Sequence, residues 1–255
     1  MIELKTENEI AALREAGRVV ARVLQAVRAQ AAVGTSLLEL DTLAADLLSD
    51  AGAKSSFLHY HPGFAPSPYP AVLCTSVNDA VVHGIPTDYR LADGDLLSVD
   101  FGASVDGWHG DSAISFVVGD ADPADLRLIE TTEQALAAGI EQAKPGNHLG
   151  DVAHPIGVIG RRAGYGLLAD HGGHGVGRAM HEAPHVPNEG PAGKGMRLRP
   201  GLVLAIEPMF IAGGRDEYRY ADDGWTIHSI DGTRAAHVEH TIAVTDEGPR
   251  ILTAL

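Results

Sequence analysis

Two aspartates, Asp100 and Asp111, flank a predicted hairpin turn in the stretch 96–118, LLSVDFGASVDGWHGDSAISFVV. The Asp-Gly pair at 106–107 lies between two alternating runs and is typical of a type I′ turn, because both central residues of that turn need positive φ. Asp100 then pairs with Ala113, and the two aspartates lie diagonally on one face, roughly 7–8 Å apart. Unless that face is open to solvent, the two carboxylates repel each other and need cations or a shared proton.

A second acid occupies the same place in a later copy of this strand. The segment 90–102, RLADGDLLSVDFG, aligns without gaps with 197–209, RLRPGLVLAIEPM, and this constant offset matches Asp100 with Glu207. Two generic turn-and-strand units would share the turn glycine but not an acid in each copy. We therefore expect two similar halves that face each other, with a site between them.

Two further residues complete a candidate metal centre. Glu239 falls on the polar side of an alternating strand expected over 237–245, and His174 lies in the run Gly-Gly-His-Gly-Val-Gly. The glycines leave the backbone free to present the imidazole at an unusual angle. With the three acids already named, this set offers four carboxylates and one neutral imidazole, which would balance two divalent cations. Such ligands suit Mn²⁺, Fe²⁺ or Co²⁺ at least as well as Zn²⁺, and they lack the thiolates of a structural zinc site.

Three other motifs indicate different chemistry and are disfavoured. Residues 181–185, HEAPH, match the zinc-protease pattern HExxH, which requires a continuous helix, but Pro184 breaks a helix there. The run GHGVGR at 173–178 lacks the third glycine of a dinucleotide-binding loop and follows no strong strand. Cys74 and His83 would suit a thiol hydrolase, but a lone cysteine in the apolar run AVLC is more often inert.

Taken together, the motifs resemble type I methionine aminopeptidase. They occur in that family's order and approximate spacing, and they cover nearly the whole chain. The resemblance implies the pita-bread (creatinase/aminopeptidase) fold, an α/β (α+β) fold of two pseudo-symmetric halves whose curved, mostly antiparallel sheet is backed by helices. The short N-terminus resembles the minimal bacterial form. The motifs that carry the resemblance are VVHGIP (81–86), SVDFG (98–102), GGHGVGRAMHEAP (172–184), AIEPM (205–209) and VEHTIAVT (238–245).

The resemblance implies a hydrolase that removes the N-terminal methionine from nascent proteins and peptides. A hydroxide bridging two divalent ions (Co, Mn, Fe or Zn) would attack the peptide carbonyl. Glu207 would shuttle the proton, while His83 and His181 would hydrogen-bond the substrate and the oxygen of the tetrahedral intermediate. The metal ligands that the resemblance implies are Asp100, Asp111, His174, Glu207 and Glu239.

The resemblance also implies a pocket for the methionine side chain, lined by Tyr60, Tyr69, Cys74, Met180 and Trp225. A soft, aromatic pocket suits a thioether, although core packing is an alternative role for the cysteine and the methionine. This chain departs from the family in the loop 59–68, which is several residues longer and has a histidine at its first position, where glycine is usual.

Two other functions remain to be separated from this one. Xaa-Pro aminopeptidases and dipeptidases share the fold and the ligand pattern, but they usually carry an added N-terminal domain. A metal-free relative that only binds partners is disfavoured, because all five ligand positions are intact.

Composition restricts the class of protein. The net charge of −15 argues against direct nucleic-acid binding and against attachment to anionic membranes. The single cysteine excludes an internal disulfide and fits a reducing compartment. The charged, amphipathic N-terminus has no apolar core of a signal peptide or membrane anchor. We therefore expect a cytoplasmic enzyme, a monomer, that meets nascent chains near the ribosome.

The elements that must position these residues follow the same plan twice. We expect one catalytic domain over 1–255, with half-repeats at about 1–120 and 121–255. Apolar spacing with capping and stop signals predicts helices over 6–30, 34–52, 122–145 and 149–163. Short strands are expected at 71–77, 96–102 and 111–118, and loops at 57–70 and 171–195.

Overall fold

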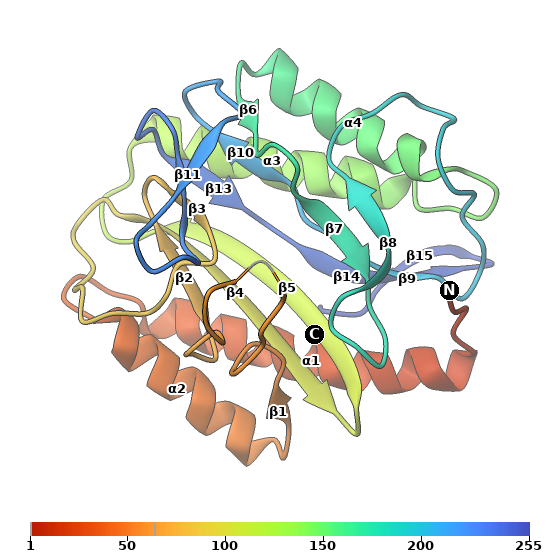
Figure 1. Ribbon diagram of the computed structural model, residues 1–255, viewed down its shortest axis with the longest axis horizontal. Helices are drawn as coiled ribbons and strands as arrows, with labels where there is room; N and C mark the ends of the chain where they lie inside the picture. The colour runs from red at the N-terminus through yellow and green to blue at the C-terminus, as the bar shows by residue number, and fades with distance from the viewer. Residues whose placement is uncertain (1, 64) are drawn as a thin grey trace.

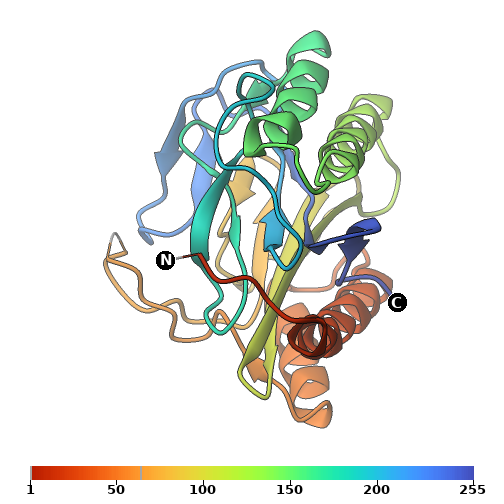
Figure 2. The same cartoon turned by 90° about the vertical axis from the view of Figure 1, so that its right-hand side faces the viewer.

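The computed structural model describes residues 2–63 and 65–255. Two pairs of helices lie at opposite ends of a layer of antiparallel strands (Figure 1). Figure 2 shows both pairs on the same side of the strands. None of the helices in the described ranges is both long and apolar enough to cross a membrane. The four helices are α1 (Glu7–Gln30), α2 (Leu37–Asp50), α3 (Pro123–Glu141) and α4 (Leu149–Arg162).

The helices begin where the sequence predicts. Thr6 caps α1 in a capping box with Glu9, and Ser36 caps α2 in the same way with Glu39. In both boxes the hydroxyl accepts a backbone N–H of the first turn while the glutamate accepts the N–H of the cap residue. Asp122 caps α3 ahead of a proline at the first helical position. The four expected helices are confirmed, with ends that differ by a few residues.

In the described part of the chain, four small antiparallel sheets make up the strand layer. Their strand orders are β1-β4-β2 with β5 paired to β4, β13-β10-β6, β11-β12-β3, and β15-β14-β9-β7-β8. The strands of the first half are β1 (Lys54–Ser55), β2 (Cys74–Val77), β3 (Ala80–Val82), β4 (Leu96–Val105) and β5 (Trp108–Val117). Those of the second half are β6 (Gly166–Leu167), β7 (Gly172–Gly175), β8 (Glu182–Pro187), β9 (Val203–Ile206), β10 (Met209–Ile211), β11 (Tyr218–Tyr220), β12 (Ile227–Ser229), β13 (Ala235–His237), β14 (His240–Thr245) and β15 (Gly248–Ile251).

The β4–β5 hairpin forms in the predicted register. Asp106 and Gly107 are the two turn residues, with φ of 51° and 77°, and Asp100 pairs with Ala113. One face of the hairpin packs its apolar side chains, among them Phe101, into a core shared with α1 and α2. That packing leaves the other face, which carries the two aspartates, turned toward the second half of the chain.

The second half repeats the order of the first. A helix pair precedes β9 as another precedes β4, and β9 begins at Val203, the position that the sequence alignment matches with the start of β4 at Leu96. An isolated bridge joins Arg90 to Ser36, the N-cap residue of α2. A matching bridge joins Arg197 to His148, the N-cap residue of α4. A separate apolar core lies under α3 and α4. The packing of a helix pair on strands is thus repeated in each half, although Ile10 and Leu13 of α1 also pack against Val203 and Ala205 of β9 in the second half.

Two expectations are wrong. The predicted loop at 171–195 contains the paired strands β7 and β8, which sequence patterns miss because β7 is mostly glycine and β8 carries two prolines. The strand predicted over 237–245 is interrupted at Glu239, which exchanges backbone hydrogen bonds with Ala113 of β5 instead of continuing its own sheet. The loop predicted at 57–70 is confirmed for its described residues; residue 64 lies outside them.

Candidate active site

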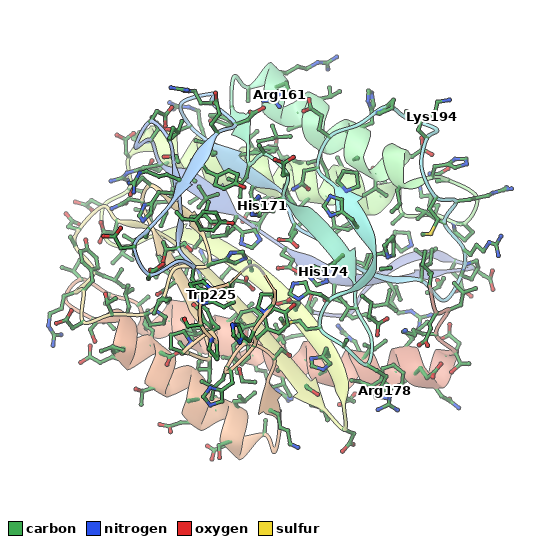
Figure 3. All side chains as sticks on the ribbon, in the orientation of Figure 1. Arg161, His171, His174, Arg178, Lys194 and Trp225 are labelled. Carbon is green, nitrogen blue, oxygen red and sulfur yellow. The ribbon has the colours of Figure 1, made fainter. Side chains whose placement is uncertain are left out.

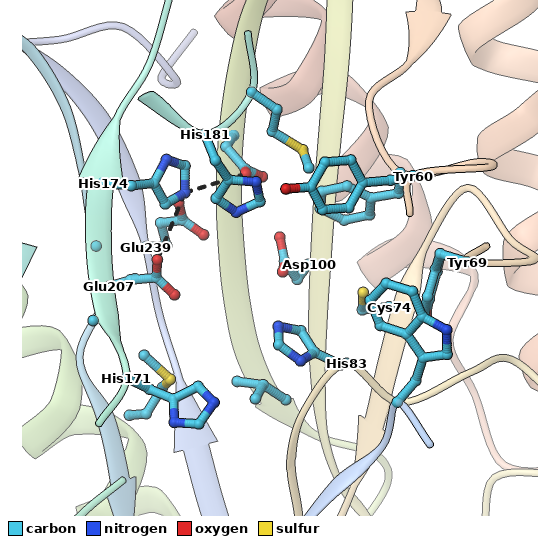
Figure 4. A pocket seen from close by; sticks show the side chains of 18 of the residues that line it. Tyr60, Tyr69, Cys74, His83, Asp100, His171, His174, His181, Glu207 and Glu239 are labelled. Atoms are coloured by element: carbon cyan, nitrogen blue, oxygen red, sulfur yellow. Dashed lines mark ion pairs between the residues drawn. The ribbon is translucent and has the colours of Figure 1, made fainter. Parts of the chain in front are cut away.

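A cleft of about 620 Å³ lies between the two halves, within the range usual for small-molecule and peptide sites. Figure 4 shows that carboxylates and imidazoles line one side of it and aromatic rings the other. Every residue predicted to bind metal or substrate lines this cleft: Tyr60, Tyr69, Cys74, His83, Asp100, Asp111, His174, Met180, His181, Glu207, Trp225 and Glu239.

The acids converge on His174. Its Nε2 lies 3.9 Å from Asp111 Oδ2 and 3.7 Å from Glu207 Oε1, the two pairs drawn as dashed lines in Figure 4. Ligand atoms of Asp111, His174 and Glu239 all lie within 4.8 Å of one another. His174 Nδ1 lies 2.9 Å from the carbonyl oxygen of Gly175. Because a carbonyl only accepts, Nδ1 carries the proton, which leaves the Nε2 lone pair free for a metal ion.

Buried hydroxyl groups join the two halves beneath this cluster. Thr241 Oγ1 accepts the backbone N–H of Asp111 and donates to the Asp111 carbonyl. Ser112 Oγ donates to the backbone carbonyl of Glu239 over 2.5 Å. Because these groups are buried and paired, the two carboxylates are held at fixed positions although they come from different halves.

The glycines beside His174 permit close packing of strands. A Cβ atom on Gly173 would collide with the backbone oxygen of Ala205, and one on Gly175 with that of Ala183. Neither glycine has positive φ. The expectation of an unusual backbone angle at His174 is therefore wrong. Glycine is required on both sides of His174 because the neighbouring strands leave no room for a side chain.

We expect Gly173→Ala to lower the free energy of unfolding by about 1–3 kcal/mol, because β7 must move away from β9 to admit a methyl group. The movement should also weaken metal binding through His174. Gly190→Ala is the matched control, since its new Cβ would make only ordinary contact with Ala153, 3.8 Å away. Chemical denaturation measures the difference, and equal stability of the two variants would contradict the packing argument.

The carboxylates of the cluster are poorly stabilised without cations. Burial, and then the charge of Asp111, raises the pKa of Asp100 well above its usual range. Burial, and then the charges of Asp111 and Glu207, does the same to the pKa of Glu239. Burial raises the pKa of Asp111 to about 6, although His174 acts in the opposite direction. Divalent ions would remove this penalty by pairing with the ionised groups.

The unpaired atoms of the cluster also fit a metal. Asp100 Oδ1, Asp111 Oδ1 and Glu239 Oε1 are buried and have no hydrogen-bond partner among the described residues. Buried carboxylate oxygens are normally paired, so three orphaned oxygens that face one cleft are suited to a cation. Oxygen ligands with one imidazole are the donor set of Mn²⁺, Fe²⁺, Co²⁺ or Zn²⁺ sites.

The affinity for a divalent ion should depend on pH. We expect the affinity for Mn²⁺ to rise at least about tenfold between pH 5 and pH 7, because bound ions require deprotonated carboxylates. Below the pKa of Asp111, raised to about 6, a proton occupies that carboxylate and must leave before the ion binds. Calorimetric titration in two buffers of different ionisation enthalpy measures both the affinity and the protons released. An affinity that stays constant over this range would contradict the assignment of the ligands.

His83 and His181 face the cleft as neutral imidazoles. Burial, aided by the nearby His171, lowers the pKa of His83 to about 4. His181 is at an exposed position, but partial desolvation by the surrounding groups, aided by His174, also lowers its pKa. The Nδ1 atom of His83 is buried and lacks a hydrogen-bond partner in the described part of the chain. Both rings can therefore donate or accept a hydrogen bond near pH 7 without bringing a positive charge.

Glu207 differs from the other acids. Burial acts to raise its pKa, but the neighbouring His237 and the charge of His174 outweigh burial and leave the pKa lowered. The carboxylate of Glu207 is therefore ionised at neutral pH and can accept a proton.

The residues predicted to line a methionine pocket form one apolar cluster beside the carboxylates. Tyr69 and Trp225 meet edge to face with ring centroids 5.0 Å apart. The Tyr69 hydroxyl is directed at the carbonyl oxygens of Leu73 and Gly84, so its polar end is satisfied and its ring is left for apolar contact. The buried members of the cluster are Phe57, Tyr69, Ala71, Cys74, Met180 and Trp225, with Tyr60 partly buried at its edge.

The long loop leaves both tyrosines at the pocket. At its base the N–H of His59 donates to the carbonyl of Tyr69, whose own N–H donates to the carbonyl of Tyr60. His59 has a φ of 66°, in the region that favours glycine, so the histidine at this position adopts a conformation that glycine would adopt at lower cost. Both tyrosines therefore line the cleft, and the described part of the loop also reaches it: Ala65 packs against the apolar cluster and the Ser67 carbonyl accepts the Trp225 indole N–H.

The disfavoured motifs do not form the sites they resemble. Residues 181–185 run into strand β8, so its two histidines share no helix face. The GHGVGR run begins in strand β7. Burial, and then the charge of Asp100, raises the pKa of Cys74 well above its usual range. Cys74 is therefore a neutral thiol that packs in the pocket and is not an activated nucleophile.

The outer wall of the cleft, formed in part by His171 and Tyr218, was not predicted from the sequence. His171, three residues before His174 (Figure 3), packs edge to face against Tyr218 with centroids 5.1 Å apart. Tyr218 and Tyr220 alternate along β11, which was not predicted as a strand. His171 could have been predicted to line the site, because it lies beside the glycine-rich run that contains His174. Strand β11 could not, because a three-residue strand is too short to show an alternating pattern. The lining residues that were missed include Phe57, Val82, Asp170, His171, Met209, Tyr218 and Tyr220.

Comparison with known proteins gives one consistent result. A model of metallopeptidase family M24 matches residues 11–246. Methionine aminopeptidase 1 of Mycobacterium tuberculosis (strain CDC 1551 / Oshkosh) is 50% identical over 261 residues, which cover 99% of this chain and 95% of that protein. The crystal structure of methionine aminopeptidase from Thermotoga maritima matches with a TM-score of 0.95 at 39% identity and full coverage of both chains. The prolidase from Pyrococcus horikoshii OT3 matches with a TM-score of 0.76 at 24% identity over 63% of its length, a likeness of fold alone.

Proposed function

The chain belongs to metallopeptidase family M24, among its methionine aminopeptidases, and on that premise we propose how its residues remove an N-terminal methionine. It has the pita-bread fold of that family and is a metal-dependent hydrolase. The observation that carries the proposal is the convergence of buried, unpaired carboxylates from both halves on His174, beside an aromatic pocket.

We assign the binding of two divalent ions to five residues. Two overlapping groups of donor atoms support the number: one contains Asp111, His174 and Glu239, and the other contains Glu207, His237 and Glu239. Asp100 completes the set with an unpaired oxygen aimed into the same cleft. Co²⁺, Mn²⁺, Fe²⁺ and Zn²⁺ all suit these donors. When bound, the ions would polarise the scissile carbonyl and acidify a water molecule.

The remaining residues bind the substrate and move the proton. The methionine side chain lies among Tyr60, Tyr69, Cys74, Met180 and Trp225, which exclude water from it. Glu207 accepts a proton from the attacking water at Oε1, the oxygen that faces His174, and passes it to the leaving amine. His83 and His181 donate hydrogen bonds to the substrate and to the developing oxyanion; as neutral rings they add no positive charge that would repel the bound ions.

We further propose that residues 1–255 act as one catalytic domain, since strands from both halves supply the cleft. The natural substrates would be nascent polypeptides with an N-terminal methionine, met near the ribosome by a monomer in the cytoplasm. The single free cysteine, Cys74, fits a reducing compartment. A net charge of −15 makes direct binding to RNA unfavourable.

Two tripeptides separate this function from its alternatives. The Mn²⁺-loaded protein is expected to release methionine from Met-Ala-Ser and to leave Ala-Pro-Ala intact, and the chelated protein to do neither. Preferential cleavage of Ala-Pro-Ala would indicate an Xaa-Pro peptidase, and metal binding without cleavage of either would indicate a non-catalytic relative. Neither alternative is favoured by the comparisons, because the prolidase likeness is one of fold alone.

A further inference from the structure

His237, at the end of β13, is buried against Glu207, whose pKa it helps to lower, and it is neither a proposed ligand nor a proposed substrate contact. It is 2% exposed. Its Nε2 lies 3.4 Å from Glu207 Oε2 and 3.9 Å from Glu239 Oε2. Within the described residues, Nε2 has no hydrogen-bond partner of good geometry. The two oxygens of Glu207 are thus divided: Oε1 faces His174 at 3.7 Å, and Oε2 faces His237.

The backbone holds this imidazole in place. The N–H of His237 donates to Ser115 Oγ over 3.0 Å, and the Ser115 hydroxyl donates back to the His237 carbonyl over 2.7 Å. Ser98 Oγ lies 2.8 Å from Ser115 Oγ and 3.3 Å from the same N–H. In β10, Met209 pairs with His237 from the other side. Two buried serines of the first half therefore fix a histidine of the second half beside the metal cluster.

We propose that His237 is a positioning residue of the metal centre, whose Nε2–H is donated to Glu207 Oε2 and holds that carboxylate with Oε1 turned toward His174. The inference rests on the proposed function of Glu207. A carboxylate oxygen only accepts, so an unprotonated Nε2 would place two lone pairs against each other at this distance. Donation also leaves Oε1 as the oxygen available to an ion and to the transferred proton.

Direct ligation is the competing role for His237, whose donor atom groups with those of Glu207 and Glu239. Donor atoms about 2.1 Å from one ion lie at most about 4.2 Å apart. The distances from Nε2 to Glu207 and Glu239, 3.4 and 3.9 Å, fall within this limit. The division of the Glu207 oxygens favours positioning, because the oxygen that faces the Asp111 cluster is the one remote from His237. The experiment must therefore distinguish a donated proton from a donated lone pair.

A conservative substitution makes that distinction. His237→Leu removes the donor, and loss of such an outer partner typically costs about 10–100-fold in metal affinity or activity. We expect a loss of that size in Mn²⁺ affinity and in kcat for Met-Ala-Ser, with KM changed by less than about threefold because the methionine pocket is untouched. His237→Gln, whose amide N–H can replace the imidazole donor but not its ligating lone pair, should recover most of both losses. His154→Leu, at an exposed position of α4, is the control and should match the unchanged protein.

The proposal is overturned if His237→Leu binds Mn²⁺ as tightly as the unchanged protein, or if His237→Gln is as impaired as His237→Leu. Should the leucine variant fail to fold, the unchanged protein decides the matter by ¹H–¹⁵N NMR of its histidine rings with Zn²⁺ bound. We expect the His237 Nε2 to carry a proton, whereas a metal-bound nitrogen at that position would refute the proposal. Neither metal titration nor NMR requires peptidase activity, so failure of this inference is distinguishable from failure of the proposed function.

Discussion

Asp111→Asn is expected to lower kcat/KM for Met-Ala-Ser by at least about 10³-fold, because it removes the carboxylate at the centre of the cluster. Asparagine has nearly the same shape, so the change deletes charge without leaving a cavity. Asp111 is 4% exposed and lies within reach of both His174 and Glu239. A rate lowered 10³-fold corresponds to the loss of several kcal/mol of transition-state stabilisation by the metal, since about 1.4 kcal/mol of barrier height changes a rate tenfold.

The same variant should not weaken the metal-free fold. Removing one of several mutually repelling carboxylates relieves repulsion, so the melting temperature of the metal-free variant should equal or exceed that of the unchanged protein. Asp106→Asn in the turn of the same hairpin is the control, because asparagine tolerates the positive φ found there. It should retain activity and metal content. Asp111→Asn with near-normal activity, or Asp106→Asn with equal loss, would refute the role given to Asp111.

His83→Asn is expected to reduce kcat by about 10²–10³-fold while metal content stays unchanged. His83 presents a neutral imidazole to the cleft, and it is not among the described groups that could hold an ion. Asparagine is chosen because His83 has a φ of 60°, where alanine would add backbone strain and confuse the result. Steady-state kinetics and elemental analysis of the same preparation measure the two quantities.

His59→Asn provides the matched control for this experiment. His59 is another histidine with positive φ, 66°, but its side chain is exposed outside the cleft. The variant should keep normal turnover. Full activity of His83→Asn, or a loss of metal equal to its loss of turnover, would remove His83 from the catalytic machinery.

Local signals predicted the parts of the fold that depend on neighbouring residues. The Asp-Gly pair at 106–107 fixed the hairpin register, because a type I′ turn allows one pairing of its strands. Capping residues such as Thr6 and Asp122 marked helix starts, because the cap satisfies backbone donors within one turn. The offset that matched Asp100 with Glu207 indicated two facing halves, and the pita-bread fold is confirmed by the comparisons.

The remaining features depend on contacts between distant segments. The glycines of β7 gave no alternating pattern, although Gly173 is required by the close approach of Ala205, which lies in another strand much later in the chain. The break at Glu239 arises because its backbone bonds to β5, which no pattern within 237–245 contains. His237 was within reach of sequence reasoning: it lies two residues before Glu239, the spacing that places side chains on one strand face.

Anomalous diffraction from crystals grown with Mn²⁺ tests the proposed metal centre most directly. We expect two anomalous peaks in the cleft, each about 2.1 Å from donor atoms contributed by Asp100, Asp111, His174, Glu207 and Glu239. Absence of a peak in the cleft, or peaks held by other residues while these five remain unliganded, would refute the proposed metal centre.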